Sequence, residues 1–183
     1  MPCFGRVMRN ECRLALAFLV AALPVAPQWD KYEEIPFMAT PVWVIDEMLK
    51  MAGVTAKDIV YDLGSGEGDI VIRVAQKCGA RGVGIEFRPE LVRKSRQNAW
   101  DAKVADKVRF IHGDFFYTDI REATVVTLFL LPEVNRALRP KLLTELKPGS
   151  RIVAHAFPIP DWKPDKFLEK DGRKIFLWVV PAP

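Results

Sequence analysis

Residues 60–68 read Val-Tyr-Asp-Leu-Gly-Ser-Gly-Glu-Gly, and this stretch decides the fold expected for the chain. The apolar run 58–63 is typical of a short buried strand, and glycines follow at once at positions 64, 66 and 68. Glycine lets the backbone turn sharply and lets a ligand approach the main chain closely. From Ile70 the pattern becomes helical. The stretch therefore predicts a strand–loop–helix junction, where open α/β sheets bind nucleotide-like ligands.

The charge of this loop separates two candidate ligands, a dinucleotide and S-adenosyl-L-methionine (SAM). A dinucleotide places its pyrophosphate at the helix N-terminus, where N–H groups and the helix dipole favour anions. Asp62, Glu67 and Asp69 would repel that group. SAM has no phosphate and carries an ammonium and a sulfonium, so acidic side chains suit it. The spacing G-x-G-x-G also differs from the dinucleotide pattern G-x-G-x-x-G.

Acidic residues also follow the next two predicted strands. The segment 82–86 ends at Glu86, whose carboxylate can accept hydrogen bonds from ribose hydroxyls, a feature that NAD enzymes share. The strand 107–112 leads to Asp114 and Phe115, an acid that can accept from the adenine amino group and a ring that can cover the adenine. Acids at three successive strand ends predict a SAM site.

The rest of the chain alternates between strand and helix patterns. This alternation implies a parallel sheet with right-handed crossovers. Near the C-terminus, Asp171-Gly172 is a strong signal for an antiparallel hairpin, which a dehydrogenase would not have. A helix is expected after Thr40, a candidate cap, and Pro41, with its end at Gly53. The other predicted elements are strands at 59–63, 82–86, 107–112, 124–130 and 150–156, and helices at 68–78, 89–103 and 133–146.

Composition limits the size and the partners of the protein. With 183 residues, half of them apolar, the chain supports one compact domain and little else. Its net charge of +4 is mildly basic, without the clustered positive stripe of a nucleic-acid binder. Three cysteines and two histidines lack the spacing of a metal site or a disulfide framework. We therefore expect no nucleic acid partner and no metal.

The order of these motifs resembles the class I SAM-dependent methyltransferases from about Ile35 to Trp178. The resemblance implies an α/β fold, a Rossmann-like seven-stranded sheet with a C-terminal antiparallel hairpin, and SAM as the cofactor. Four segments are similar to a narrower group, the protein-lysine methyltransferases that include the archaeal broad-specificity enzyme and the mitochondrial enzymes for the ATP synthase c subunit and the adenine nucleotide translocase. These segments are 35–41, 62–68, 124–132 and 157–165. Ala39 departs from this group, which often has proline there.

The resemblance also implies the residues of the site and a lysine side chain of a protein as the methyl acceptor. The substrate channel is expected at Leu131, Phe157 and Trp162, with Phe37 as a further wall. Main-chain carbonyls near Leu130 and Leu131 are expected to orient the amine, and no dedicated base is expected. Leu130-Leu131-Pro132 replaces the Asn/Asp-Pro-Pro-aromatic motif of adenine and glutamine methylation. The cofactor is expected to contact Phe37, Thr40, Asp62, Gly64, Gly66, Glu86, Asp114 and Phe115.

Other interpretations of these residues stay open at this point. Each channel aromatic could be ordinary core, and Phe129, inside a predicted strand, is better explained as core. His155 is interpreted as structural rather than as a general base, and Glu133 and Asn135 as caps of a helix. The alternative functions are a small-molecule methyltransferase and a SAM-binding protein without turnover.

The N-terminus has a separate character. Residues 14–26 are uncharged and follow Arg6, Arg9 and Arg13. The run is shorter than the ~20 residues of a spanning helix but fits a signal peptide. We expect residues 1–27 to form a signal-like or membrane-anchor segment and residues 28–183 the SAM-dependent methyltransferase domain. The flanking charges favour export, whereas SAM is made in the cytoplasm, so the side of the membrane stays open. The alternative is a helix buried on the core.

Overall fold

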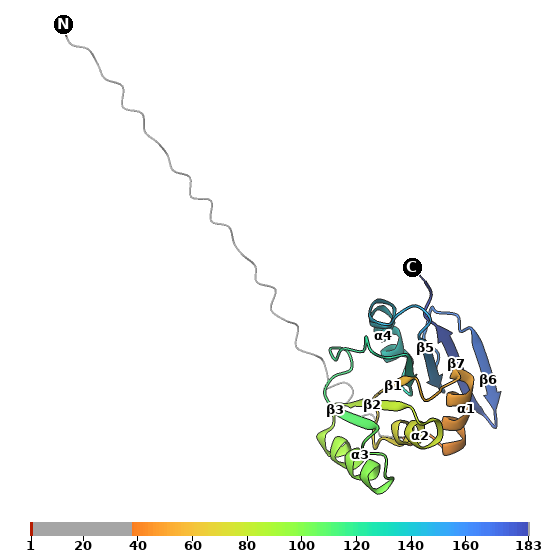
Figure 1. Ribbon diagram of the computed structural model, residues 1–183. Coiled ribbons are helices and arrows are strands. Elements are labelled where there is room, and N and C mark those ends of the chain that lie inside the picture. Colours follow the sequence, from red (N-terminus) through yellow and green to blue (C-terminus); the bar gives the residue numbers. More distant parts are fainter. Residues whose placement is uncertain (2–37, 183) are drawn as a thin grey trace. The chain divides into compact units, whose positions relative to one another are not determined.

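The computed structural model describes Met1 and residues 38–182 (Figure 1). All of its helices and strands belong to the unit Phe37–Pro183. The predictions for residues 1–27 and for Phe37 lie outside the described residues. Within 38–182, no helix has both the length and the apolar character needed to cross a membrane.

Seven strands form one mixed sheet in the order β3-β2-β1-β4-β5-β7-β6. The first five strands of this order run parallel, and β7 pairs antiparallel with both β5 and β6. The predicted fold class and the C-terminal hairpin are therefore confirmed. The strands are β1 (Ile59–Leu63), β2 (Arg81–Glu86), β3 (Val108–His112), β4 (Val125–Leu128), β5 (Arg151–His155), β6 (Lys166–Lys170) and β7 (Arg173–Val179).

Within residues 38–182, four helices accompany the sheet, namely α1 (Val42–Ala52), α2 (Asp69–Cys78), α3 (Pro89–Asp101) and α4 (Pro132–Glu145). Most bounds fall within two residues of those predicted, and two details were wrong. Thr40 does not cap α1, because Pro41 occupies the N-cap position and no side chain bonds to the helix end. The strand predicted to reach position 130 ends at Leu128. Leu128 pairs with Leu63, the last residue of β1, and the chain turns away from the sheet at Gly64.

The core that packs against α1 identifies the side chains of β1, β4 and β5 that point to the α1 face of the sheet. Val60, Val125 and Val153 of three adjacent strands pack in one cluster with residues of α1 and α2. Side chains two positions apart point to the same face of a strand. Asp62, Thr127 and His155 therefore continue this face toward the carboxyl ends of β1, β4 and β5.

The chain changes direction in the sheet between β1 and β4. From β1 it winds outward through β2 to β3, and it then returns to the other side of β1 with β4 and β5 (Figure 1). Ligands of open α/β sheets bind at this switch point, beyond the carboxyl ends of the strands. The connection 113–124 contains no helix or strand and begins with the predicted Asp114 and Phe115.

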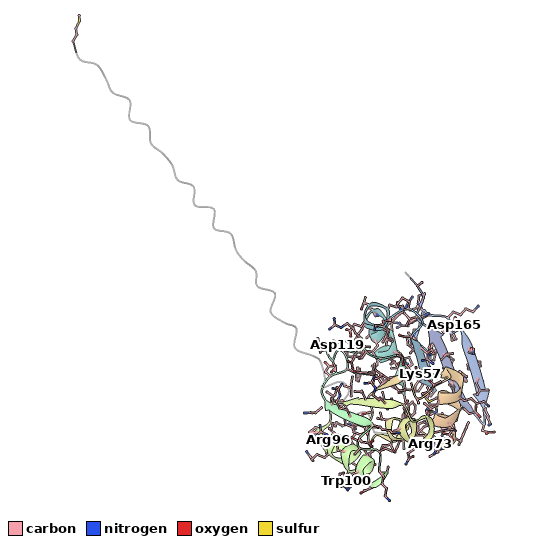
Figure 2. All side chains as sticks on the ribbon, viewed as in Figure 1. Lys57, Arg73, Arg96, Trp100, Asp119 and Asp165 are labelled. Atoms are coloured by element: carbon pink, nitrogen blue, oxygen red, sulfur yellow. The ribbon has the colours of Figure 1, made fainter. Side chains whose placement is uncertain are left out.

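The basic residues of α3 lie at the β3 edge of the sheet. Figure 2 shows Arg96 and Trp100 on this helix, and Trp100 is 73% exposed. Arg96 donates from Nη2 to the main-chain carbonyl of Phe110 in β3 at 2.9 Å. This bond satisfies a carbonyl of a strand at the edge of the sheet. Arg96 thus has a structural role.

Candidate active site

A tight turn joins β1 to α2 at the switch point of the sheet. Gly64, Gly66 and Gly68 have φ values of 80°, 52° and 89°, in the left-handed region that favours glycine. A Cβ atom on Gly68 would lie 2.7 Å from Cζ of Phe110, so a side chain does not fit there. The three glycines allow the sharp turn that the sequence predicts between β1 and α2.

Glu86 holds this turn in place. Its side chain is 2% exposed, and Oε2 accepts a hydrogen bond from the Gly66 N–H at 2.9 Å. Oε1 accepts from the main-chain N–H of Arg88 at 3.0 Å and from its Nε–H at 3.3 Å. The sequence predicted only a ligand contact for this carboxylate. Its contacts add a positioning role, because they tie the end of β2 to the glycine turn.

Asp62 is a buried carboxyl group whose surroundings favour a cationic ligand. It is 3% exposed, and Oδ1 accepts a hydrogen bond from the Thr127 hydroxyl at 2.6 Å. Burial raises the pKa of Asp62 to about 7, and the charges of Glu86 and Asp69 act in the same direction, whereas the Thr127 bond opposes them. A positive group beside this carboxyl would restore its ionised form.

Asp114 and Phe115 stand at the entry to the 113–124 connection. Oδ1 of Asp114 accepts from the Phe116 N–H at 2.6 Å, whereas Oδ2 is buried and finds no hydrogen-bond partner among the described residues. Burial raises the pKa of Asp114. Phe115 is 6% exposed, and its Cε1 atom lies 3.9 Å from the place of a Cβ on Gly64. Phe115 thus lies next to the glycine turn, and the residue before it carries an unsatisfied buried acceptor.

These groups fit SAM. Buried polar atoms are normally paired, and the free Oδ2 of Asp114 leaves one acceptor for a ligand N–H. The glycine turn allows close approach, and the carboxyl groups of Asp62 and Glu86 match a positive charge. Asp114, Asp62 and Glu86 come from neighbouring strand ends, as predicted.

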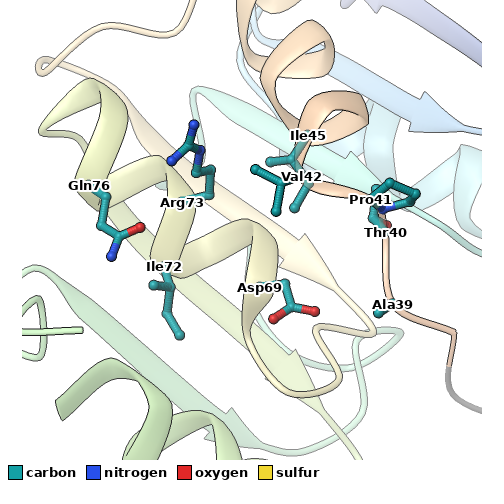
Figure 3. Close-up of a pocket in the computed structure, with 9 residues that line it drawn as sticks. All are labelled: Ala39, Thr40, Pro41, Val42, Ile45, Asp69, Ile72, Arg73 and Gln76. Atoms are coloured by element: carbon teal, nitrogen blue, oxygen red, sulfur yellow. The ribbon is translucent and has the colours of Figure 1, made fainter. Parts of the chain in front are cut away.

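Thr40 lies apart from these acids, in a pocket of about 410 Å³ between α1 and α2 (Figure 3). The pocket adjoins the glycine turn through Asp69, the first residue of α2. Arg73 also lines it, and its guanidinium is paired with Asp46 through two bonds of 2.8 Å. The lining residues are Ala39, Thr40, Pro41, Val42, Ile45, Asp69, Ile72, Arg73 and Gln76.

The predicted channel residues lie around the ends of β4 and β5. Leu131 is the N-cap residue of α4 and is 38% exposed, and Phe157 is half-buried beyond β5. Trp162 is also half-buried, with its ring centroid 6.1 Å from that of Trp178 and 5.9 Å from the guanidinium carbon of Arg139. Trp162 therefore packs between α4 and β7.

Asn135 connects Leu130 to Phe157, and the prediction of a capping role for it was wrong. No side chain caps α4. Asn135 is fully buried, and Nδ2 donates to the carbonyl of Leu130 at 3.3 Å and to those of Phe157 and Pro158 at 3.2 Å each. An asparagine within the otherwise apolar buried row of a helix is a signal that could have indicated this role.

His155 is buried beneath the same region. It is 0% exposed, its ring lies 4.2 Å from that of Phe129 between centroids, and neither ring nitrogen bonds to any described residue. Burial lowers the pKa of His155 to about 4, and the positive charge of Arg173 contributes. The imidazole is neutral near pH 7 and too weak a base to take a proton from an ammonium. Phe129 itself lies just beyond β4 rather than within it.

The sheet order, the C-terminal hairpin and the acids at three strand ends define a class I methyltransferase. A family model, the ANTKMT methyltransferase domain, matches residues 62–166. The chain belongs to this methyltransferase family.

Three similar proteins illustrate the range of the family. A protein-lysine N-methyltransferase of Saccharolobus islandicus (strain REY15A) is 42% identical over 80% of this chain and 94% of its own length. A lysine N-methyltransferase of Xenopus laevis, named for the c subunit of ATP synthase, is 36% identical over 92% of this chain and 74% of its own. A solved structure, an RNA methyltransferase from Salinibacter ruber in complex with S-adenosyl-L-homocysteine (SAH), is 51% identical. It covers 80% of this chain and 95% of its own, with a TM-score of 0.79.

Proposed function

We propose that this protein is a SAM-dependent protein-lysine N-methyltransferase. The observation that carries the proposal is that two unlike groups of side chains lie at one edge of the sheet: buried carboxyl groups at the ends of β1 to β3, and the apolar side chains of Leu131 and Phe157 beyond β4 and β5. The first suits a cationic methyl donor and the second suits an uncharged amine. The names of the Saccharolobus islandicus and Xenopus laevis relatives support the choice of lysine.

In this proposal, residues at different strand ends bind different parts of the cofactor. Glu86 accepts from the ribose hydroxyls with the lone pairs that Gly66 and Arg88 leave free. The Asp114 Oδ2 atom accepts from the adenine amino group, and Phe115 covers the adenine ring. Asp62 in its ionised form balances the positive charge of the ligand, and Gly64 lets the ligand approach. Thr40 and Phe37 complete the set from the segment before α1.

The acceptor side must supply a neutral amine. Bound SAM supplies a methyl group activated by a sulfonium, so the protein mainly aligns the amine and excludes water. A free lysine has a pKa of ~10.4, and its ammonium has no lone pair. The apolar surroundings of Leu131, Phe157 and Trp162 lower that pKa by desolvation, and a nearby cationic cofactor adds like-charge repulsion. His155 is too weak a base to take the proton, so the proton leaves to water before the amine enters.

RNA is the second candidate acceptor, because the 51% identical Salinibacter ruber protein is titled an RNA methyltransferase. Two features of this chain favour lysine. Leu130-Leu131-Pro132 follows β4 in place of the amide-bearing motif that serves adenine amines, and the net charge of +4 is small for an RNA-binding protein.

Labelled methyl transfer tests the proposal. The full chain is incubated with tritiated SAM and, in parallel, with a protein extract, total RNA and a small-molecule extract, and products are identified by mass spectrometry. Methyl-lysine in protein is the expected result. Methylated RNA or a methylated small molecule would replace the lysine assignment, and SAH binding without any product would mean a binding protein without turnover. Glu86→Ala serves as the control without bound cofactor.

We propose further that residues 1–27 hold the domain at a membrane and that the protein substrate is membrane-associated. The support is the uncharged run 14–26 behind three arginines. Fractionation of cells that express the full chain should recover it with membranes, and Leu19→Glu, which interrupts the run, should release it. Equal distribution of the two proteins would refute the anchor. Protease access to the domain in sealed vesicles would identify the side of the membrane.

A further inference from the structure

One carboxamide joins the two strand ends that flank the proposed acceptor channel. Nδ2 of Asn135 donates to the carbonyl of Leu130, beyond β4, and to the carbonyls of Phe157 and Pro158, beyond β5. A primary amide has two N–H groups, so three acceptors at 3.2–3.3 Å share them. Carbonyl oxygens repel one another, and this donor allows the three to converge.

Other side-chain contacts tie the 157–162 loop to α4 and β7. The Trp162 carbonyl accepts from Nε1 of Trp178 at 2.9 Å, and the Trp162 ring lies beside Arg139. Asp161 pairs with Arg136 at 3.4 Å on the exposed surface. None of these contacts involves Leu130 or Leu131. The bonds of Asn135 therefore link the β4 end to this loop.

The backbone beside these bonds is strained. Ala156 has φ 65° and Asp161 has φ 61°, both in the left-handed region that non-glycine residues rarely adopt. Such residues persist where surrounding contacts over-determine the conformation, and they cluster at functional sites. Ala156 directly precedes Phe157, whose carbonyl Asn135 binds. The amide thus secures the point at which the chain turns out of β5.

The side chain of Asn135 is not fully satisfied by the fold. Its Oδ1 atom is buried and has no hydrogen-bond partner among the described residues. A buried acceptor without a partner costs free energy, which offsets part of what the three donated bonds contribute to stability. An asparagine within the apolar row of α4 therefore carries a cost that its bonds to the three strand-end carbonyls must outweigh.

We propose that Asn135 is a positioning residue for methyl transfer, which sets the separation between the Leu130–Leu131 wall and the Phe157 wall of the acceptor channel. The inference rests on the proposed function, because it assigns these walls to the amine. Asn135 acts through main-chain carbonyls, so its loss misaligns the amine and leaves the cofactor site intact. Misplacement by about 1 Å is enough to cost about 100-fold in rate.

Two substitutions of the full-length chain test this role with poly-L-lysine as the acceptor. Asn135→Leu removes the donor at similar volume, and Asn135→Asp places a carboxylate against three carbonyls. We expect kcat to fall about 100-fold in both. The Kd for SAH, measured by calorimetry, stays within about twofold of wild type, since the bonds of Glu86 and Asp114 are untouched.

Asn98 provides the matched control. It also donates from Nδ2 to a main-chain carbonyl, that of Glu67 at 3.0 Å, but within the cofactor loop. Asn98→Leu should raise the Kd for SAH severalfold, the opposite pattern to Asn135→Leu.

Wild-type kcat in Asn135→Leu would overturn the inference, and so would a parallel loss of SAH binding. If the wild type methylates RNA or a small molecule and not lysine, the proposed function fails. The same comparison of kcat with the Kd for SAH, made on that acceptor, then decides the role of Asn135.

Discussion

The two halves of the proposed site are built on different principles. The cofactor half, at the ends of β1, β2 and β3, consists of buried carboxyl groups and a glycine turn, and its key contact joins Gly66 to Glu86. The acceptor half, at the ends of β4 and β5, is apolar, and Asn135 and Trp178 hold it together. A cofactor of fixed structure requires polar groups at fixed places, whereas an uncharged amine requires a dry surface of the right width.

The largest expected effect is in the cofactor half, at Glu86. Glu86→Ala removes the acceptor for Gly66 and Arg88 and for the ribose, and each charge-assisted bond contributes about 1.5–3 kcal/mol. The Kd for SAH, measured by calorimetry, should rise by more than about 100-fold. Glu90→Ala, on the exposed start of α3, is the control and should bind as the wild type does. An unchanged Kd in Glu86→Ala would remove Glu86 from the cofactor site and break the comparison.

The grouping of the acids at neighbouring strand ends could be predicted from the sequence because each of its signals is local. A strand, a glycine turn and an acid lie within a few residues at Asp62, and Glu86 and Asp114 repeat the acid at the next strand ends. The parallel sheet then brings the three together without further information. The ties of Glu86 to Gly66 and Arg88 were missed because a carboxylate at a strand end is equally compatible with a purely ligand-binding role.

The structure around the ends of β4 and β5 could be predicted only in outline. The Pro/Trp loop marks its place, but its assembly depends on contacts between residues far apart in the chain, such as Asn135 with Phe157 and Trp178 with Trp162. Helix position alone favours a cap for Asn135. Only the packing of α4 against the sheet puts its amide beside three carbonyls. The left-handed Ala156 has no sequence signal, since alanine rarely adopts that conformation.

The next effect in size concerns the adenine end of the cofactor. In Asp114→Asn, the oxygen that accepts from Phe116 is kept, so the amide N–H₂ takes the place of the free Oδ2. A donor then faces the donor of the adenine amino group, and we expect the Kd for SAH to rise about 30-fold. S-inosyl-L-homocysteine, with an oxygen in place of that amino group, should bind the variant better than SAH. The same preference in the wild type would contradict the role of Asp114.

An effect on stability, rather than on affinity, follows from the raised pKa of Asp62. The unfolded chain has the usual pKa of ~3.9, whereas the folded value is about 7. Between pH 4 and 7 the folded state holds a proton that the unfolded state has released. The free protein therefore loses stability as the pH rises through this window and changes little above it. Thermal unfolding at several pH values between 4 and 8 measures this loss. The free energy of unfolding of the wild type should fall between pH 4 and pH 7 relative to that of Asp62→Asn.

Ligand binding should show the opposite trend. Because the ionised form of Asp62 favours a cationic ligand, the affinity for SAM should increase about tenfold from pH 6 to pH 8, with release of a proton. Calorimetry in buffers of different ionisation enthalpy measures that proton. Asp62→Asn should bind SAM with a flat pH profile, and a profile equal to that of the wild type would assign the titration to another group.

The smallest effect on stability and on kcat is expected for an exposed ion pair of the acceptor half, in contrast to the effect expected for the buried Asn135. Arg136 and Asp161 form an ion pair of 3.4 Å with side chains 62% and 73% exposed. Water and salt screen such pairs, which contribute about 0–1 kcal/mol. Arg136→Gln should therefore leave the Tm and the kcat for poly-L-lysine close to wild type, although Arg136 is the neighbour of Asn135 in the sequence and contacts the same loop. A fall in kcat of more than about threefold would mean that the surface, and not the buried amide, holds the channel wall. The acceptor half would then depend on exposed charge, and its kcat should fall with added salt in the wild type as well.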